Sequence, residues 1–336
     1  MVSTVRVSVF ILVWLLPVAV WADYSQREDV QTYIAQLSTQ YGFDTTRLEK
    51  LLGAAQRKRN ILEAIARPAE RHKPWHEYRD LFVSPLRIEG GVEFWSENST
   101  VLERATQRFG VPPEIIVAII GVETWYGRRT GSFRVVDALT TLAFDYPPRA
   151  RFFLSELTEF LLLAREENKD PLTFKGSYAG AMGYGQFIPS SFRAYAIDFD
   201  GDGTRDIWNS TIDAIGSVGN YFARHGWRGD GPVALQVEVA GTRAEKIMNE
   251  SLKLNYDIAE LVKLGVKIPM SNDDRLNGDT KAALFRMIGD NGPEYWVGLN
   301  DFFVITRYNH SSMYALAVFQ LGQAIRQRAE RLALIR

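Results

Sequence analysis

The stretch between Gly110 and Gly127 constrains the fold more than any other part of the sequence. It reads GVPPEIIVAIIGVETWYG. Proline in a first helical turn and an acidic residue beside it favour the start of a helix, and Pro112, Pro113 and Glu114 provide both. The residues that follow, up to Glu123, are apolar on nearly all sides, so the helix should be buried. We therefore predict a buried helix over residues 114–123.

Other segments carry helical or strand patterns. Apolar residues at helical spacing predict helices in these ranges: much of 23–71, from Gly90-Gly91 to Phe109, 149–167, 190–196, 212–225 and 308–335. Alternation at Val233, Leu235, Val237 and Val239 predicts a strand. Residues 261–268 and 294–306 have β-type composition, and 279–287 fits a strand or a short helix. The fold class predicted is α+β, predominantly α-helical, with a small β-rich insertion.

These patterns divide the chain into consecutive parts. We predict a cleaved leader at 1–22, an N-terminal helical part at 23–75, a core at 76–227, a small β-rich domain at 228–305 and a C-terminal helix at 306–336. The 336 residues are 46% hydrophobic and include no cysteine, so the fold depends on its core and not on disulfides. With 39 basic and 40 acidic residues, the chain lacks the basic excess of nucleic-acid-binding proteins.

The first 22 residues have the features of an export signal. Arg6 provides a short positive region, Val7–Val20 is almost entirely apolar, and Val20 and Ala22 fit a small-residue cleavage site. The apolar run of about 14 residues is shorter than the roughly 20 needed to cross a bilayer. We expect a periplasmic protein that is soluble once the signal is removed, and not an integral membrane protein. An uncleaved anchor is the alternative.

Glu123 is the first candidate for chemistry. It lies at the end of the buried helix, and Ile119 and Ile120 share its face. Desolvation and the negative end of the helix should both raise its pKa, as a general acid for glycosidic cleavage requires. Gly127 can end the helix and leave space for a ligand. The alternative is a structural glutamate that is hydrogen-bonded at a helix end.

A second candidate is the glycine-rich segment GSYAGAMGYGQFIPSSF at Gly176–Phe192. Its small residues allow the backbone to approach a ligand closely. Ser177, Tyr178, Tyr184 and Gln186 offer hydrogen bonds and a stacking face. The alternative is a tightly packed turn between helices.

Four segments together resemble one family. GVETWYG at 121–127, SYAGAMGYGQFIPSSF at 177–192, RYNHSSMYALAV at 307–318 and HEYRDLFV at 76–83 are similar to the lytic murein transglycosylase B family. The resemblance covers most of the mature chain in the same order. It implies a lysozyme-like core related to goose-type lysozyme. Members anchored in the membrane carry a lipidated cysteine, which this sequence lacks, so it is more similar to the soluble members.

The resemblance also implies an activity and a site. Glu123 would be the single catalytic acid/base in cleaving the MurNAc-β-1,4-GlcNAc bond of peptidoglycan glycan strands, with closure of a 1,6-anhydro ring. No second carboxylate is needed for this reaction; Asp137 and Asp145 are the nearest candidates for one. The candidate substrate-groove residues are Tyr78, Ser177, Tyr178, Met182, Gln186, Tyr221, Tyr308, Asn309 and Tyr314.

A metal site is predicted in the loop at 198–213. Its start, DFDGDGTRD, matches the spacing of an EF-hand calcium loop, with Asp198, Asp200, Asp202 and the Thr204 carbonyl as ligands. Position twelve is Asn209 where the motif has Glu, and the family resemblance suggests that Asp213 closes the site. We expect a structural Ca²⁺ and no catalytic cofactor. The alternative is a solvated acidic turn.

Two other functions remain open at this point. A hydrolytic muramidase would use water and leave reducing ends. A non-catalytic, calcium-stabilised peptidoglycan-binding scaffold would need no Glu123 chemistry.

Overall fold

A computed structural model describes residues 23–67, 73–248, 251–269 and 276–332. The predicted export signal lies outside these residues, as does the end of the predicted C-terminal helix. No helix in the described part of the chain is long and apolar enough to cross a membrane. The chain divides into two compact units, residues 1–57 and 58–336.

The first unit contains a 3-10 turn and two helices. Asp23 caps the turn, and Asp44 caps the second helix by accepting a hydrogen bond from the Arg47 amide. Val30, Ile34 and Leu37 form the buried face of the first helix. The elements are η1 (Tyr24–Gln26), α1 (Glu28–Tyr41) and α2 (Thr45–Gly53).

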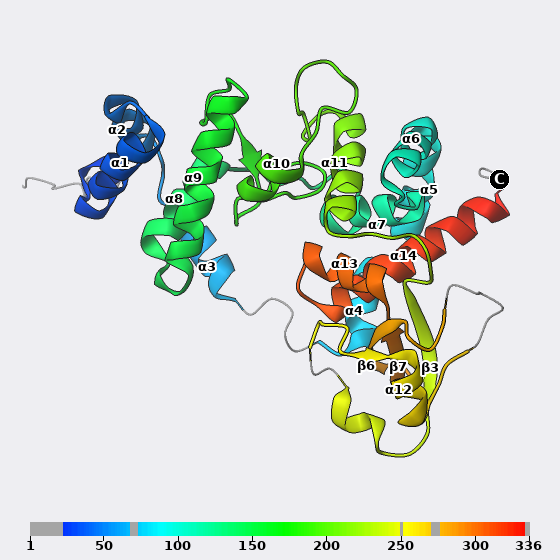
Figure 1. Cartoon of the computed structure of the whole chain (residues 1–336). Helices are drawn as coiled ribbons and strands as arrows, with labels where there is room; N and C mark the ends of the chain where they lie inside the picture. The colour runs from blue at the N-terminus through cyan, green and yellow to red at the C-terminus, as the bar shows by residue number, and fades with distance from the viewer. Residues whose placement is uncertain (1–22, 68–72, 249–250, 270–275, 333–336) are drawn as a thin grey trace, which may run out of the picture. The chain divides into compact units, whose positions relative to one another are not determined.

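The second unit is mostly helical, as the sequence predicted (Figure 1). Its helices are α3 (Arg59–Ala66), α4 (Trp75–Phe82), α5 (Pro85–Glu97), α6 (Ser99–Phe109), α7 (Pro113–Thr124), α8 (Val135–Asp145), α9 (Ala150–Glu166), α10 (Pro189–Tyr195), α11 (Thr211–Arg224), α12 (Ile258–Lys263), α13 (Asn300–Tyr308) and α14 (Ser312–Arg331). Short 3-10 turns are η2 (Pro147–Arg149) and η3 (Ala244–Ile247). A two-stranded sheet joins β1 (Phe133–Arg134) to β2 (Lys175–Gly176).

Helix α7 is the buried helix that its sequence predicts. Its residues Ile115–Val122 are all buried, and it contacts α5, α6, α11 and α14. Glu114 at the first turn pairs with Arg326 of α14 at 3.2 Å. The last long helix of the chain therefore returns to cover the central one.

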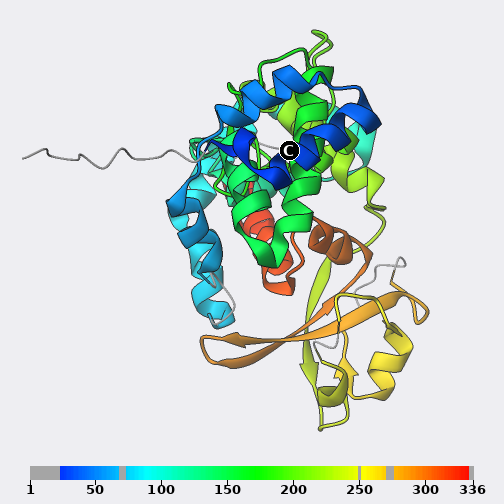
Figure 2. The ribbon, with the colours of Figure 1, turned by 90° about the vertical axis from the view of Figure 1, so that its left-hand side faces the viewer.

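A five-stranded antiparallel sheet forms the β-rich part of the unit. It has the order β4-β6-β7-β3-β5 and consists of β3 (Ala234–Val239), β4 (Tyr256–Asp257), β5 (Val266–Lys267), β6 (Lys281–Gly289) and β7 (Gly292–Gly298). Strands β6 and β7 form a long hairpin that extends past the rest of the sheet (Figure 2). At its end Arg79 of α4 pairs with Asp290 at 2.8 Å. Leu261, Leu284 and Val297 are part of a separate small core under this sheet.

Three predicted elements differ from the structure. Residues 261–268 have β-type composition, but α12 continues to Lys263 and only Val266–Lys267 form a strand. The helix predicted to begin at Gly90-Gly91 begins at Pro85, because both glycines lie inside α5 where neighbours come close: a Cβ on Gly91 would lie 2.4 Å from the Ile325 side chain. Residues 294–306 have β-type composition, but the strand ends at Gly298 and the helix α13 begins at Asn300. Its β-branched Val304, Ile305 and Thr306 are buried in the helix, so tertiary packing overrides their strand propensity.

Candidate active site

Glu123 is the second-last residue of α7, and its carboxylate is held by a tyrosine. The Tyr314 hydroxyl donates a hydrogen bond to Glu123 Oε1 at 2.5 Å. Tyr314 lies in the first turn of α14, where Ser311 caps the helix, and its ring is 2% exposed. Burial, and then the nearby Glu123 charge, raise the pKa of Tyr314 well above its usual value, so its hydroxyl keeps the proton that it donates. Glu123 itself is only partly buried.

Three more predicted tyrosines gather at the same place, from three different helices. Tyr308 at the end of α13 donates to the Gly185 carbonyl at 2.5 Å, and burial and the Glu123 charge raise its pKa. Tyr221 of α11 packs 4.7 Å from the Tyr308 ring and donates to the Arg307 carbonyl at 2.7 Å. Tyr78 of α4 is buried and lies close enough to Tyr314 to influence its pKa. We call Tyr78, Tyr221, Tyr308 and Tyr314 the tyrosine cluster.

The end of α7 is fixed by residues that the sequence analysis did not identify. Arg87 is 7% exposed and donates to the Gly121 carbonyl at 2.5 Å, and its guanidinium lies 4.5 Å from the Trp125 ring. A cation at the carbonyl end of a helix offsets the negative end of the helix dipole. The negative helix end was one of our two reasons to expect a raised pKa for Glu123. Arg87 weakens that reason and leaves desolvation as the other. The only sequence signal for this role is that Arg87 lies at helical spacing from the apolar residues of α5.

The chain reverses sharply after Glu123. Trp125 and Tyr126 both have left-handed backbone conformations, with φ values of 53° and 58°, and Gly127 follows at 83°. The reversal places the Tyr126 ring beneath Gly121, and the Tyr126 hydroxyl donates to the Arg87 carbonyl at 2.7 Å. Non-glycine residues in this region are strained and persist only where surrounding contacts hold them.

The glycines of the second motif are packed against protein. A Cβ on Gly127 would lie 2.1 Å from the Tyr184 ring, and on Gly176 it would lie 2.3 Å from the Ala181 carbonyl oxygen. On Gly185 it would lie 2.8 Å from the Tyr308 hydroxyl. Protein atoms therefore fill the space beside each of these three glycines, as a tightly packed turn requires. The approach of a ligand to the backbone of this segment stays a prediction.

The remaining groove candidates lie in or near this turn. Gln186, with φ 49°, donates to the carbonyls of Thr130 and Gly183, and the Ser177 hydroxyl accepts from the amides of Ala179 and Ala181. Tyr178 is partly exposed and Asn309 is exposed. Met182 has no exposed surface, so it supports the turn and presents no side-chain surface to a ligand.

The predicted metal loop brings three carboxylates together. Oxygens of Asp198, Asp200 and Asp202 lie within 4.8 Å of one another, and Asp200 and Asp202 are exposed. The amides of Gly201, Asp202 and Gly203 donate to Asp198, and these bonds lower its pKa. Carboxylate and carbonyl oxygens are the ligands that Ca²⁺ prefers, so the donor set fits this ion.

Asp213 holds the backbone of the metal loop, a role that the sequence did not predict. It is 1% exposed, and its oxygens accept hydrogen bonds from the amides of Phe199, Asp200 and Asp206 at 2.7, 3.4 and 2.8 Å. Both of its oxygens therefore hold the loop backbone, and it is not one of the grouped carboxylates. Three carboxylates come together here, and Asp213 fixes the loop that carries them. Closure of a metal site by Asp213 stays a prediction.

Comparison with known proteins identifies the family. Residues 25–323 match the family described as the transglycosylase SLT domain. The chain belongs to this family. It is also 44% identical over 313 residues to the membrane-bound lytic murein transglycosylase B of Escherichia coli, covering 90% of this chain and 84% of that protein. It is thus an enzyme of the lytic transglycosylase class.

Solved structures of lytic transglycosylases have the same fold. The catenated SltB1 of Pseudomonas aeruginosa is 51% identical, with a TM-score of 0.87 over 91% of this chain and 99% of that one. The Escherichia coli enzyme Slt35, solved in complex with calcium, is 43% identical, with a TM-score of 0.82 over 91% of this chain and 95% of that one. The lysozyme-like α+β fold predicted from the sequence is therefore confirmed.

Proposed function

We propose that this lytic transglycosylase cleaves the MurNAc-β-1,4-GlcNAc bond of peptidoglycan, with Glu123 as its only acid/base group. The observation that carries this proposal is the hydrogen bond from Tyr314 to Glu123. It fixes one carboxylate oxygen inside the tyrosine cluster while the side chain stays partly exposed. A general acid needs this combination of fixed geometry and access to substrate.

The reaction needs one carboxyl group used twice. Protonated Glu123 donates to the oxygen that links the two sugars, and the acetamido oxygen of the muramyl residue stabilises the cationic centre. The carboxylate then takes the proton of the 6-hydroxyl of the same sugar, whose oxygen bonds to the anomeric carbon. This closes the 1,6-anhydro ring. Because the attacking hydroxyl is intramolecular, its effective concentration exceeds that of water.

The surroundings of Asp137 support a mechanism with one carboxylate. Its oxygens accept two hydrogen bonds from Arg134, at 2.9 and 2.7 Å, and Lys58 lies 3.7 Å away. It is 1% exposed. A carboxylate that is buried and paired in this way cannot act as the nucleophile or base of an ordinary glycosidase.

We further propose that Asp198, Asp200, Asp202 and the Thr204 carbonyl bind a structural Ca²⁺. The calcium complex of Slt35 supports this assignment. We also propose that the chain is exported to the periplasm and released there by cleavage after Ala22, where its partner is the glycan of peptidoglycan. The charge balance of the chain gives no support for a nucleic-acid partner.

The substitution Glu123→Gln tests the catalytic assignment. It keeps the size of the side chain and removes the transferable proton, so digestion of purified sacculi should fall by roughly 10²–10⁴-fold. Glu97→Gln, at an exposed position on α5, is the matched control and should digest normally. Unchanged digestion by Glu123→Gln would show that another group is the acid.

Mass spectrometry of the released muropeptides tests the reaction type. We expect 1,6-anhydro products, which are lighter by one water than the reducing-end products of a hydrolytic muramidase. Reducing ends alone would assign the hydrolytic alternative. Release of no muropeptides, with sacculi still bound, would assign the non-catalytic scaffold.

A further inference from the structure

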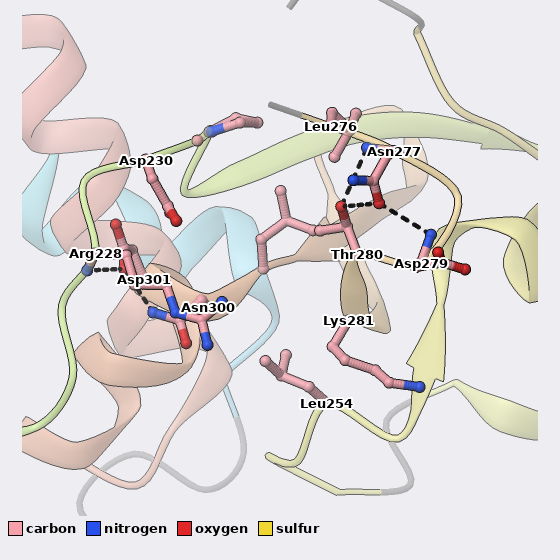
Figure 3. A pocket seen from close by; sticks show the side chains of 13 residues that line it. Arg228, Asp230, Leu254, Leu276, Asn277, Asp279, Thr280, Lys281, Asn300 and Asp301 are labelled. Atoms are coloured by element: carbon pink, nitrogen blue, oxygen red, sulfur yellow. Dashed lines mark hydrogen bonds between the residues drawn. The ribbon is translucent and has the colours of Figure 1, made fainter. Parts of the chain in front are cut away.

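A cavity of about 530 Å³ lies between the β-rich part and the start of α13 (Figure 3). One wall comes from residues 228–232 and 299–301, and the other from 276–281, with Leu254 beside it. None of its lining residues belongs to the tyrosine cluster or to the metal loop. The proposed catalytic step gives this cavity no role.

Both walls of the cavity are held by hydrogen bonds. Asp301, 3% exposed, accepts from the amides of Arg228 and Gly229 at 2.9 and 2.8 Å. On the opposite wall, the Asn277 side chain accepts from the Asp279 amide at 3.0 Å and from the Thr280 hydroxyl at 3.2 Å. The cavity is therefore largely formed before any ligand arrives, as is usual for binding sites.

The lining carries exposed charges of both signs. Arg228 and Lys281 are cationic, and Asp230 and Asp279 are anionic. Within the described residues, the carboxylates of Asp230 and Asp279 have no ion-pair partner. The lining also has apolar surface from leucines but includes no aromatic ring, the usual platform for a sugar. This chemistry favours a short ligand that has both carboxylates and an ammonium group.

Helix α13 connects the cavity to the tyrosine cluster. Asn300 and Asp301 at its start line the cavity, and Tyr308 at its end belongs to the cluster. At 1.5 Å per residue, the eight steps between Asn300 and Tyr308 span about 12 Å. An extended peptide covers about 3.3–3.6 Å per residue, so about four residues bridge this distance. A peptide stem joined to a muramyl sugar has this length.

We propose that this cavity binds the charged end of a peptide stem carried by the glycan that Glu123 cleaves. Arg228 and Lys281 bind the carboxylates of the stem, and Asp230 and Asp279 bind the ammonium group of its diamino acid. The proposal rests on the proposed function, because the muramyl sugar at Glu123 is what directs the stem along α13.

The test compares glycan strands that keep their stems with strands stripped of stems by an amidase. We expect the protein to have a KM about fivefold lower on the strands with stems, with similar kcat on both. The double variants Asp230→Asn/Asp279→Asn and Arg228→Gln/Lys281→Gln should raise the KM for strands with stems to that for stripped strands. Neither should alter cleavage of stripped strands. Glu238→Gln, on exposed β3 surface outside the cavity, is the control.

Two results would overturn the proposal: a wild-type protein with equal KM on both substrates, or double variants that keep the preference. Failure of the proposed function gives a different result, because a non-catalytic scaffold would cleave neither substrate. In that case a binding experiment tests the cavity by itself. Saturation transfer from the Glu123→Gln protein to a free tetrapeptide stem should be seen, and should be lost when Asp230 and Asp279 are also replaced; no transfer to the peptide would reject the site.

Discussion

At the scale of single residues, Tyr314 is the group that most directly controls Glu123. Its hydroxyl donates to the carboxylate and so favours the ionised form over the acid. In Tyr314→Phe the acid form should persist to higher pH, which moves the alkaline limb of the activity profile upward. Looser positioning should also lower kcat roughly tenfold.

The pH dependence of kcat for Tyr314→Phe, measured on sacculi, checks this expectation. Tyr41→Phe replaces an exposed tyrosine of α1 and should leave the profile unchanged. A Tyr314→Phe profile that matches the wild type would mean that the hydrogen bond does not govern the protonation of Glu123.

His225 gives the protein a stability that depends on pH. Its ring stacks on Tyr221 at 4.0 Å, and its Nδ1 lies 2.7 Å from the Tyr221 carbonyl oxygen. Burial, aided by the charge of Arg307, lowers the pKa of His225 below its usual 6.5. The unfolded chain therefore takes up the proton more readily, so stability is complete above pH 6.5 and falls as the pH drops through the lower folded value.

We expect the melting temperature of the wild type to drop below pH 6.5 more steeply than that of His225→Gln. Thermal unfolding above and below this pH measures the difference. His310→Gln, at an exposed position, is the control and should unfold like the wild type. Parallel curves for wild type and His225→Gln would remove this histidine as a source of acid sensitivity.

Sequence reasoning could find Glu123 but not the residues that hold it. A carboxyl at the end of an apolar helix is visible locally, whereas Tyr314 is 191 positions away and was expected only through the family resemblance. Arg87 was missed because its role depends on α5 and α7 packing together. The Asp213 amide contacts were missed because the spacing of a loop does not show which oxygens point toward its backbone.

At the scale of elements, the turn after α7 depends on Gly121. A Cβ there would lie 2.6 Å from the Tyr126 hydroxyl and 2.7 Å from its ring. We expect Gly121→Ala to cost about 1–3 kcal/mol of stability, because the ring has no free space to move into. Chemical denaturation measures this cost. Gly278→Ala, where a Cβ makes only an ordinary 3.4 Å contact, should change stability little; equal effects would contradict the packing argument.

The metal loop contains aspartates that are proposed to bind Ca²⁺ and one aspartate, Asp213, that holds the loop backbone. Asp200→Asn removes an exposed carboxylate of the proposed calcium site, so it should abolish the rise in melting temperature that we expect Ca²⁺ to give the wild type. Asp213→Asn loses a carboxylate that holds three amides, so it should destabilise the protein by about 1–3 kcal/mol with or without Ca²⁺. Melting curves with Ca²⁺ and with a chelator test both. Equal wild-type curves would remove the metal assignment.

At the scale of the whole molecule, the spacing of apolar residues predicted most of the helices but not how they pack together. The apolar composition of α7 indicates that other helices surround it. The helical pattern after Tyr308 indicates that the chain returns to the helical part after the β-rich part. Neither pattern indicates that α14 would bring Tyr314 to Glu123. The order of the five strands depends on long-range pairing, and the cavity at α13 depends on two segments that meet only in the folded chain.

In the proposed mechanism, the anchoring of Glu123 decides whether the carboxyl group or the sugar moves during the reaction. Arg87 and Thr124 hold the last turn of α7, Thr124 through its bond to the Tyr184 carbonyl at 2.9 Å, and Tyr314 holds the carboxylate. An acid fixed in this way cannot travel from the bridging oxygen to the 6-hydroxyl. We therefore expect the muramyl ring to change its pucker between the two proton transfers and bring its own hydroxyl to a stationary base.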